Sequence, residues 1–337
     1  RTMDGCIGLS TQDSMRLYVD DKLLIDGWGK DKSADQALDF HFEAGRTYKI
    51  RIEFVNDRRG ARVIFGYSAG RENFPAAVEA ARKADVAILC MGDNEETSGE
   101  NFDRTDLNLP GRQLELVQAV YATGTPVVLV LQSGRPVTAN WENDHLSAIL
   151  EAWFPGEQGG TAIAKTLFGD AAPGGRLPIT FPRSVGQIPC HYSRRPGGGK
   201  RYVEMDWLPL YPFGYGLTYT TFAYRDMALS RSVIGPQDTV TVSVTVTNTG
   251  KYTGDAVPQL YVRDMFSSVV KPERQLAAFR RLTLAPGESR RVELTVGPDR
   301  KSRIGVDYGW RVELGKCELQ LGENAENILL RADLTVE

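Results

Sequence analysis

Cysteine and histidine are scarce in this 337-residue chain, with four of the first and three of the second. The cysteines are scattered, and no two have the close spacing of a metal or redox pair: Cys6, Cys90, Cys190 and Cys317. We therefore expect reduced thiols, with Cys90 a small core residue inside an apolar run. The three histidines, His41, His145 and His191, are too few for a His-rich metal site. Neither count decides the compartment.

Long apolar runs and a strong excess of one charge are also missing. No stretch approaches the roughly 18 apolar residues of a membrane-spanning helix. The formal charge of -3 and the isoelectric point near 5.8 give no reason to expect nucleic acid. We expect neither a membrane nor a nucleic acid as partner, and a neutral, sugar-like substrate fits the charge better than a polyanion.

The composition that is present predicts a folded chain. Hydrophobic residues make up 42% of the sequence, enough to bury substantial cores, and the length predicts two or three domains. The chain begins Arg1-Thr2-Met3, with neither an initiator Met at position 1 nor the layout of a signal peptide. We expect a carboxyl-terminal piece of a longer polypeptide.

Residues 15–68 predict short strands separated by turns. Residues 16–20 lead through Asp21-Lys22 into residues 23–26, which is the pattern of a β-hairpin. Residues 47–54 alternate with period two, and residues 61–67 predict a last strand.

The middle of the chain alternates strand and helix patterns, which predicts a largely parallel sheet covered by helices. The run at 125–131 is nearly all apolar, as in a strand buried on both faces. We expect helices at 75–84, 111–122 and 159–168, and strands at 86–91, 125–131 and 148–153.

The end of the chain predicts a β-sandwich. After Pro182 the sequence has long loop character, and at 239–246 valine recurs at every second position, as in a strand with one buried face. Further short strands separated by turn clusters predict an antiparallel sandwich, at 257–262, 278–284, 289–296 and 315–321.

An acidic, glycine-containing loop, residues 92–110, follows the strand at 86–91. Ligand groups gather outside the carboxyl ends of strands in open α/β sheets, so we look for chemistry in this acidic loop. It carries Glu95, Glu96 and Glu100. By residue type alone, a loop glutamate is more often a solvated carboxylate than a catalyst.

The loop sequence Ser98-Gly99-Glu100-Asn101-Phe102-Asp103-Arg104, followed by Leu107-Asn108-Leu109-Pro110, resembles the acid/base loop of family 3 glycoside hydrolases. That loop is usually written Gly-Glu-Gly-Tyr-Asp-Arg, so Asn101 and Phe102 are departures from it, while the carboxylate is kept. Other blocks resemble the family in the expected order, at 133–137, 153–160, 173–182, 211–222 and 271–276.

The resemblance implies a multidomain protein. We expect residues 1–68 to be the carboxyl-terminal half of a PA14-like β-sandwich, on the strand order within residues 10–68. Residues 69–210 would form a mostly parallel α/β sandwich, and residues 211–337 a fibronectin-III-like β-sandwich with its linker.

The resemblance also implies a function: a retaining, exo-acting β-glucosidase that removes terminal non-reducing β-D-glucosyl residues. Glu100 would be the general acid/base, protonating the departing oxygen and later taking a proton from water. The nucleophile would lie on an amino-terminal barrel portion, as a separate chain or cleaved polypeptide. This chain alone would be inactive, and neither a cofactor nor a metal is implied.

Four further residues are candidates around Glu100. Asp103 and Arg104 would shape the loop and hold Glu100, the alternative being an ordinary local ion pair. Phe102 and Trp28 would contact the sugar, and a packing role stays open for both. Glu95 and Glu96 are the rivals of Glu100. Polar groups expected to support the sheet and the domain interface, not to catalyse, are Arg135 and Glu157-Gln158.

Alternatives remain open at the level of function. The chain could belong to another family 3 glycosidase, such as a β-xylosidase, an arabinofuranosidase or an N-acetylglucosaminidase. It could also be a non-catalytic carbohydrate-binding or scaffolding chain. The resemblance is compatible with export to the periplasm or out of the cell, and with a higher-order dimer.

Overall fold

The computed structural model describes residues 2–11, 14–29, 36–55, 63–68, 74–197 and 201–337. The chain divides into two compact units. The first comprises Arg1–Ala84 with Gln118–Thr123, and the second Asp85–Val117 with Gly124–Glu337. No helix in the described ranges is long and apolar enough to cross a membrane.

The first unit is built from two three-stranded antiparallel sheets, β4-β1-β6 and β3-β2-β5. Both sheets contribute to one core, where Ile7, Leu9, Met15 and Leu17 are at most 2% exposed. The elements are β1 (Met3–Thr11), β2 (Met15–Val19), β3 (Lys22–Asp26), β4 (Gln36–Phe42), β5 (Ile50–Phe54) and β6 (Val63–Ser68), followed by α1 (Pro75–Arg82).

The predicted hairpin is confirmed as β2 and β3, but its turn lies one residue earlier than the predicted Asp21-Lys22. Val19 pairs with Lys22, so the loop consists of Asp20 and Asp21, whose φ angles are 50° and 63°. Two left-handed residues are what a type I′ turn requires. Asp20 is fixed further by the Lys49 N–H, which donates to its Oδ1 at 2.9 Å. The predicted strand at 47–54 is shorter, beginning at Ile50.

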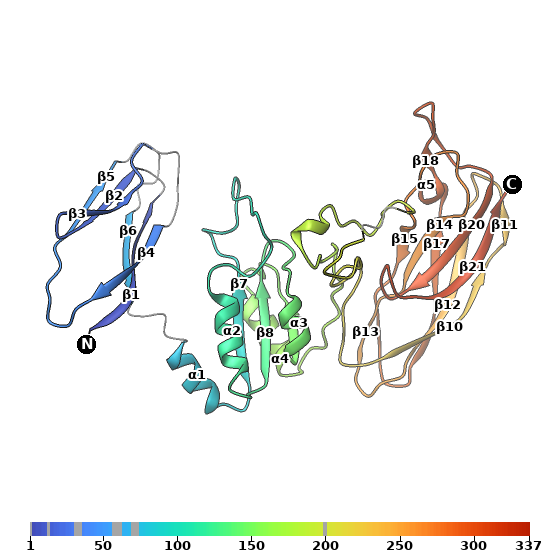
Figure 1. Cartoon of the computed structure of the whole chain (residues 1–337). Coiled ribbons are helices and arrows are strands. Elements are labelled where there is room, and N and C mark those ends of the chain that lie inside the picture. Colours follow the sequence, from blue (N-terminus) through green and yellow to red (C-terminus); the bar gives the residue numbers. More distant parts are fainter. Residues whose placement is uncertain (1, 12–13, 30–35, 56–62, 69–73, 198–200) are drawn as a thin grey trace. The chain divides into compact units, whose positions relative to one another are not determined.

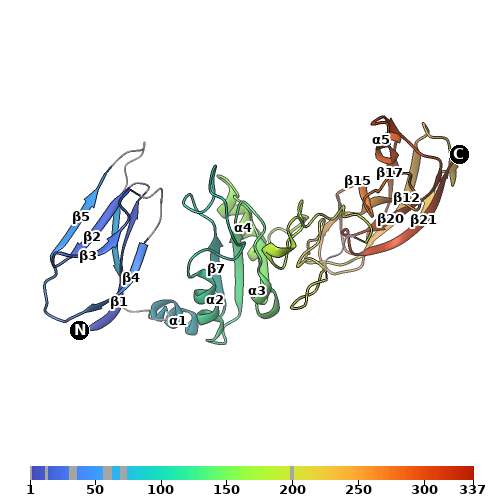
Figure 2. The same ribbon diagram turned by 45° about the horizontal axis from the view of Figure 1, so that its top comes forward.

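The first part of the second unit contains the predicted parallel sheet, in the order β7-β8-β9. Figure 1 shows β7 and β8 side by side, and Figure 2 shows the helices around β7 from a second direction. The strands are β7 (Ala87–Gly92), β8 (Val127–Gln132) and β9 (Ala148–Glu151). The helices are α2 (Gln113–Tyr121), whose last four residues are grouped with the first unit, α3 (Asn140–His145) and α4 (Gly159–Leu167). One face of β8 packs Leu129 and Leu131 with Val117 of α2 and Trp141 of α3. The helix α3 was not among the predicted elements.

The prediction that Cys90 is a core residue is wrong. β7 is an edge strand, and its Leu89 and Met91 pack into the core while Cys90 and Ile88 point the other way and are exposed. The run is apolar on both faces, but only one face of this strand is covered. An apolar run alone could not distinguish the two faces.

The rest of the second unit is β-rich, and its two larger sheets share one core with the small sheet β13-β16. The valines of β12 confirm the predicted half-buried strand, because Val240, Val242, Val244 and Val246 are all fully buried. The three-stranded sheet has the strand order β10 (Phe222–Leu229), β12 (Val240–Asn248), β17 (Ser289–Val296). The five-stranded sheet has the strand order β11 (Val233–Ile234), β21 (Ile328–Val336), β20 (Gly315–Gly322), β14 (Gln259–Asp264), β15 (Gln275–Phe279).

All pairs in these two sheets are antiparallel except the short β11–β21 pair. The strand predicted at 278–284 is two strands, because β15 ends at Phe279 and β16 begins at Leu282. The remaining elements are β13 (Gly254–Ala256), β16 (Leu282–Leu284), α5 (Pro298–Lys301), β18 (Arg303–Ile304), β19 (Trp310–Arg311) and the 3-10 turn η1 (Val185–Gln187).

One buried glutamine joins the α/β part to the β-rich part. The Gln259 side-chain nitrogen donates to the carbonyl of Gly214 at 3.0 Å and to that of Glu323 at 2.6 Å, and the Tyr261 hydroxyl donates to Gln259 Oε1 at 2.6 Å. Gly214 has a φ of 83°, and a Cβ there would lie 2.1 Å from Gln259 Oε1. The close approach therefore requires glycine.

Candidate active site

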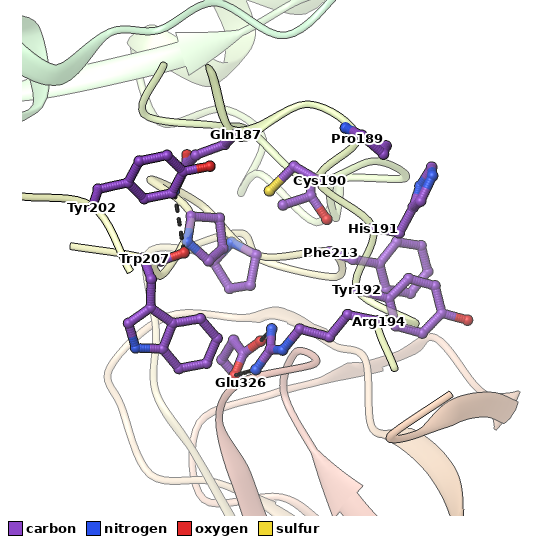
Figure 3. Close-up of a pocket in the computed structure, with 13 residues that line it drawn as sticks. Gln187, Pro189, Cys190, His191, Tyr192, Arg194, Tyr202, Trp207, Phe213 and Glu326 are labelled. Atoms are coloured by element: carbon purple, nitrogen blue, oxygen red, sulfur yellow. Dashed lines mark hydrogen bonds and ion pairs between the residues drawn. The ribbon is translucent and has the colours of Figure 1, made fainter. Parts of the chain in front are cut away.

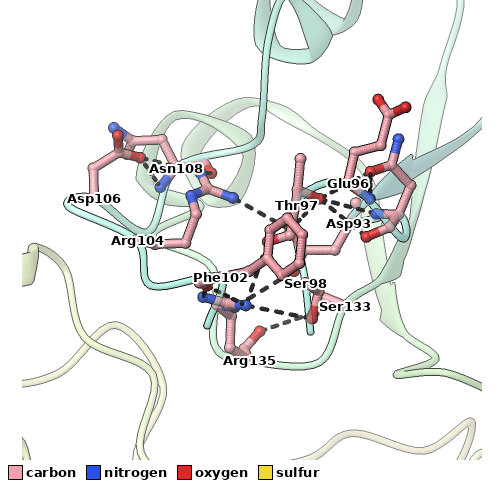
Figure 4. Close-up of polar contacts among 12 residues, drawn as sticks. Asp93, Glu96, Thr97, Ser98, Phe102, Arg104, Asp106, Asn108, Ser133 and Arg135 are labelled. Carbon is pink, nitrogen blue, oxygen red and sulfur yellow. Dashed lines mark hydrogen bonds and ion pairs between the residues drawn. The ribbon is translucent and has the colours of Figure 1, made fainter. Parts of the chain in front are cut away.

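A buried carboxylate lies where β7 ends and the acidic loop begins. The side chain of Asp93 is 4% exposed, and two arginines face it. Arg104 Nη1 lies 3.2 Å from Asp93 Oδ1, and Arg135 Nε lies 3.7 Å from Oδ2 (Figure 4). Two such partners offset the cost of burying a carboxylate away from water.

Arg135, which follows β8, ties the loop to the sheet. Its guanidinium donates to the carbonyls of Thr97 and Phe102, each at 3.4 Å, and to Ser98 Oγ at 3.3 Å (Figure 4). The Ser133 hydroxyl donates to the Arg135 carbonyl at 2.9 Å and so fixes the arginine backbone.

The first turn of the loop is closed by its own polar side chains. The Thr97 hydroxyl donates to Asp93 Oδ1 at 3.1 Å, and Asn94 Oδ1 accepts the Glu96 N–H at 3.0 Å. This second bond is an Asx turn, a local substitute for a backbone turn. At the far side of the loop, Arg104 donates to the carbonyl of Asn108 at 3.0 Å.

Glu100 lies in a turn of the loop that is closed by the Phe102 backbone N–H donating to the carbonyl of Gly99 at 3.2 Å. Its side chain is exposed, and among the described residues its carboxylate has no hydrogen bond or ion pair. The next residue, Asn101, has a φ of 66°. The loop therefore has a fixed base and presents a carboxylate outward.

A second acid lies at the end of β9. Glu151 Oε1 accepts the Trp153 N–H at 2.9 Å and is 3.5 Å from Ser133 Oγ, while Oε2 is buried without a hydrogen-bond partner in the described part of the chain. Burial raises the pKa of Glu151 to about 7, and the hydrogen bonds from Trp153 and Ser133 oppose that rise. Glu151 therefore holds a proton up to near-neutral pH.

An aromatic hollow lies elsewhere in the second unit. It is lined by residues within 180–213 together with Glu326 (Figure 3). Arg194 closes one side, with its guanidinium carbon 4.5 Å from the Trp207 ring centroid and Nη1 2.7 Å from Glu326 Oε1. Arg194 and Glu326 form an ion pair with each other. No residue of the acidic loop lines the hollow.

Within the described ranges, no group of three His, Cys, Asp or Glu side chains lies close enough together to hold a metal ion.

Comparison with known proteins decides the family. Residues 11–219 match the glycosyl hydrolase family 3 C-terminal domain, and residues 256–325 match a fibronectin type III-like domain. The chain belongs to glycoside hydrolase family 3. The PA14-like character of residues 1–68 stays a prediction.

Family 3 relatives are longer than this chain. A beta-xylosidase from Formosa agariphila is 44% identical over 302 residues, which are 86% of this chain and 42% of that protein. A periplasmic beta-glucosidase from Salmonella typhimurium is 41% identical over 263 residues, 75% of this chain and 34% of that protein. The crystal structure of a beta-glucosidase from Kluyveromyces marxianus has a TM-score of 0.75 at 27% identity, covering 100% of this chain and 43% of that one. The chain thus spans less than half the length of these relatives.

The family 3 loop pattern can now be placed residue by residue. Asn101 stands where that pattern has glycine, and its left-handed φ explains the choice, since asparagine tolerates this conformation better than most residues. Arg104 anchors the loop, but through Asp93 and Asp106, not through Asp103. Asp103 is exposed and makes no ion pair in the part of the chain that the structure describes.

Two residues of the site were not predicted. Asp93 was not singled out, although it directly follows a strand, which is a usable signal. Arg135 was set aside as support for the sheet, whereas it contacts the acidic loop itself.

The two aromatic candidates differ in setting. Phe102 is 40% exposed on the same loop as Glu100. Trp28 belongs to the first unit. Its backbone N–H donates to Asp26 Oδ1, and the Arg16 guanidinium carbon lies 4.8 Å from the centroid of its ring. One face of the Trp28 ring is therefore stacked on a cation.

Proposed function

We propose that this chain is the carboxyl-terminal portion of a retaining, exo-acting β-glucosidase and that Glu100 is its general acid/base. The observation that carries the proposal is the placement of Glu100. Its carboxylate is exposed in a turn of a loop whose base is bound through Asp93, Arg104 and Arg135 to the ends of two parallel strands. Family 3 membership and relatives named beta-glucosidase support the same reaction.

The chemistry requires two carboxyl groups. Glu100 would protonate the departing glycosidic oxygen, while a second carboxylate attacks the sugar carbon and forms a covalent intermediate. Glu100, now ionised, would then take a proton from the water that releases the sugar. The second carboxylate has to lie about 5 to 5.5 Å from Glu100.

The partner that supplies this nucleophile would be the amino-terminal barrel portion of the same enzyme. The chain by itself would then be inactive, because an acid/base alone cannot form the covalent intermediate. Asp93, Arg104 and Arg135 would act as positioning residues that keep Glu100 in place when the two portions meet. Asp103 and Phe102 would contribute to the loop surface that faces the substrate.

Replacing Glu100 by glutamine in the assembled enzyme tests this function. We expect Glu100→Gln to lower turnover of a β-linked glucose disaccharide by roughly 10²- to 10⁴-fold, because the leaving group can no longer be protonated. An aryl β-glucoside with a good leaving group should keep much of its glycosylation rate, and azide should raise its turnover by replacing water as the acceptor.

Glu95→Gln and Glu96→Gln serve as controls, since they remove charge from the same loop. Unchanged turnover of both substrates by Glu100→Gln would refute the acid/base assignment and direct attention to these rivals. If the unmodified assembled enzyme hydrolysed no glycoside, the alternative of a carbohydrate-binding or scaffolding chain would replace the enzyme proposal.

A β-xylosidase is the second candidate within the enzyme class, favoured by the 44% identity to the Formosa agariphila beta-xylosidase. The two sugars differ only by the hydroxymethyl group of glucose. The ratio of kcat/KM for aryl β-glucoside and aryl β-xyloside decides between them, and a ratio well below one would favour the xylosidase.

A further inference from the structure

Ser133, the residue that directly follows β8, has one hydroxyl proton and two acceptors within reach. Its Oγ lies 2.9 Å from the carbonyl oxygen of Arg135 and 3.5 Å from Glu151 Oε1. Figure 4 shows the first of these contacts. A hydroxyl donates one proton, so the two acceptors compete for it. Because Ser133 is 0% exposed, bulk water does not replace the hydrogen bond that is lost.

The two acceptors differ in how their strength can change. The Arg135 carbonyl is always neutral, whereas the Glu151 carboxyl is either neutral or charged. A hydrogen bond to an ionised acceptor is roughly twice as strong as one to a neutral acceptor. The Ser133 proton should therefore stay on the nearer carbonyl while Glu151 is neutral and turn toward Glu151 when it ionises.

Glu151 is held where this competition can operate near neutral pH. Trp153 has a φ of 52°, so the chain turns sharply after β9, and the Trp153 N–H donates back to Glu151 Oε1 at 2.9 Å. Burial raises the pKa of Glu151 to about 7 against the hydrogen bonds from Trp153 and Ser133. No charged side chain of the described residues adds to these three influences. Ser133 is therefore the side chain that responds to the charge of Glu151.

The Arg135 backbone matters because the Arg135 guanidinium holds the acidic loop. It donates to the carbonyls of Thr97 and Phe102, each at 3.4 Å, and to Ser98 Oγ at 3.3 Å. These distances are longer than those of a typical N–H···O bond, so each contact is weak alone. The loop then depends on where the arginine backbone lies, which is what Ser133 fixes.

We propose that Glu151 is a positioning residue for the acidic loop: the neutral acid leaves the Ser133 proton on the Arg135 carbonyl, and the ionised acid competes for that proton and releases the Arg135 backbone. The inference rests on the proposed function, in which Glu100 needs a fixed loop to protonate the leaving group. The proton that Glu151 loses passes to solvent, and only hydrogen bonds are rearranged.

Hydrogen exchange of the loop amides tests the coupling in this chain without any turnover. The Ser98 N–H donates to the carbonyl of Asn94 at 3.0 Å and the Phe102 N–H to that of Gly99 at 3.2 Å. Between pH 6 and pH 8, on either side of the Glu151 pKa, we expect the protection factors of these two amides to fall by roughly two- to tenfold, the effect of about one hydrogen bond. The β8 amides are the internal reference for overall stability.

Three variants separate this coupling from a general effect of pH. Glu151→Gln cannot ionise, so the fall should be absent. Ser133→Ala removes the shared proton, so protection should be low at both pH values and unchanged by adding Glu151→Gln. Glu142→Gln is the matched control, because Glu142 is 3% exposed, burial also raises its pKa, and its carboxyl bonds to its own backbone N–H. It should keep the wild-type fall.

The same coupling should appear in turnover by the assembled enzyme. We expect kcat/KM of Glu151→Gln for a β-linked glucose disaccharide to equal that of the wild type at pH 6 and to exceed it by roughly two- to tenfold at pH 8. This ratio cancels the titration of Glu100 itself, which both proteins share.

Wild-type protection that is equal at the two pH values, or that falls equally in Glu151→Gln, overturns the coupling and leaves the Glu100 assignment standing. A pH-dependent protection with a constant kcat/KM ratio refutes the positioning role in catalysis. If the assembled enzyme hydrolyses no glycoside, the proposed function fails, and hydrogen exchange still decides whether Glu151 controls the loop.

Discussion

Glu151 is an acid whose position in the fold controls its charge. Its carboxyl group receives hydrogen bonds at Oε1 only, and Oε2 is buried without a partner in the described residues. Loss of hydration raises its pKa from an ordinary value of 4.5 to about 7. The folded protein therefore binds a proton that the unfolded chain releases between those two pH values.

This linkage predicts a pH-dependent stability. Because the pKa of Glu151 is higher in the folded protein than in the unfolded chain, its contribution to the free energy of unfolding is fully present below pH 4.5. That contribution is lost as the pH rises through 7. We expect Glu151→Gln, which cannot ionise, to be more stable than the wild type at pH 8 by about 1 to 3 kcal/mol, with the gap closing toward pH 5. Thermal unfolding midpoints across that range measure it.

Glu157→Gln is the control, because Glu157 is exposed in the same segment and should leave the pH dependence unchanged. If the thermal unfolding midpoint varied with pH in the same way for the wild type and Glu151→Gln, the raised pKa of Glu151 would be contradicted.

Residues of the acidic loop show what sequence reasoning can reach at this scale. Glu100 could be proposed as the acid/base from its neighbours in the chain, because the pattern is local. The contacts of Asp93 could not, because Arg104 and Arg135 are only two of many arginines, and which of them faces a carboxylate depends on the folded path of the chain.

Among secondary-structure elements of the first unit, the β2–β3 hairpin was predictable, and two longer strands were not. The β2–β3 hairpin is encoded by adjacent strands and a two-residue turn. β1 and β4 were missed. β1 pairs with β4 and β6, which lie far along the sequence, and β4 carries polar Asp39 and His41 within its run. Partners distant in sequence are not visible in a short window.

The hairpin turn offers a stability test. Asp21 has a φ of 63°, which glycine adopts without the steric penalty of a Cβ. We expect Asp21→Gly to stabilise the hairpin by roughly 0.5 kcal/mol, because the lost pair with Lys49 is exposed and contributes little. Hydrogen exchange of the β2 and β3 amides reports it, and Asp21→Val should accelerate exchange. Slower exchange in the valine variant would contradict the turn assignment.

At the scale of the whole molecule, the second unit depends on the join between Gln259 and Gly214. The family could be identified from the order of its sequence blocks, but this join could not, since a side chain of β14 reaches a backbone carbonyl 45 positions away. Such a contact leaves no periodic pattern in the sequence.

Gly214→Ala should disturb this join. The new Cβ would displace Gln259 from its buried hydrogen bonds and force a left-handed alanine, so we expect a loss of about 2 to 4 kcal/mol in the free energy of unfolding. Gly287→Ala is the control, because Gly287 has a φ of 74° but no heavy atom within 4 Å of its Cβ position. It should lose only about 1 kcal/mol. Equal losses in calorimetry would show that Gln259 does not constrain the join.

The anchorage of the acidic loop at both ends has a consequence for its length. Asp93 and Arg104 close residues 94–103 into a loop whose ends are already held together. Once the ends are fixed, lengthening a flexible loop adds little closure entropy, about 0.6 kcal/mol for each doubling. Insertions and deletions between these two anchors can therefore change the surroundings of the Glu100 carboxylate without destabilising the sheet. Length variation in this segment is a way for proteins with the same fold to differ around the same carboxylate.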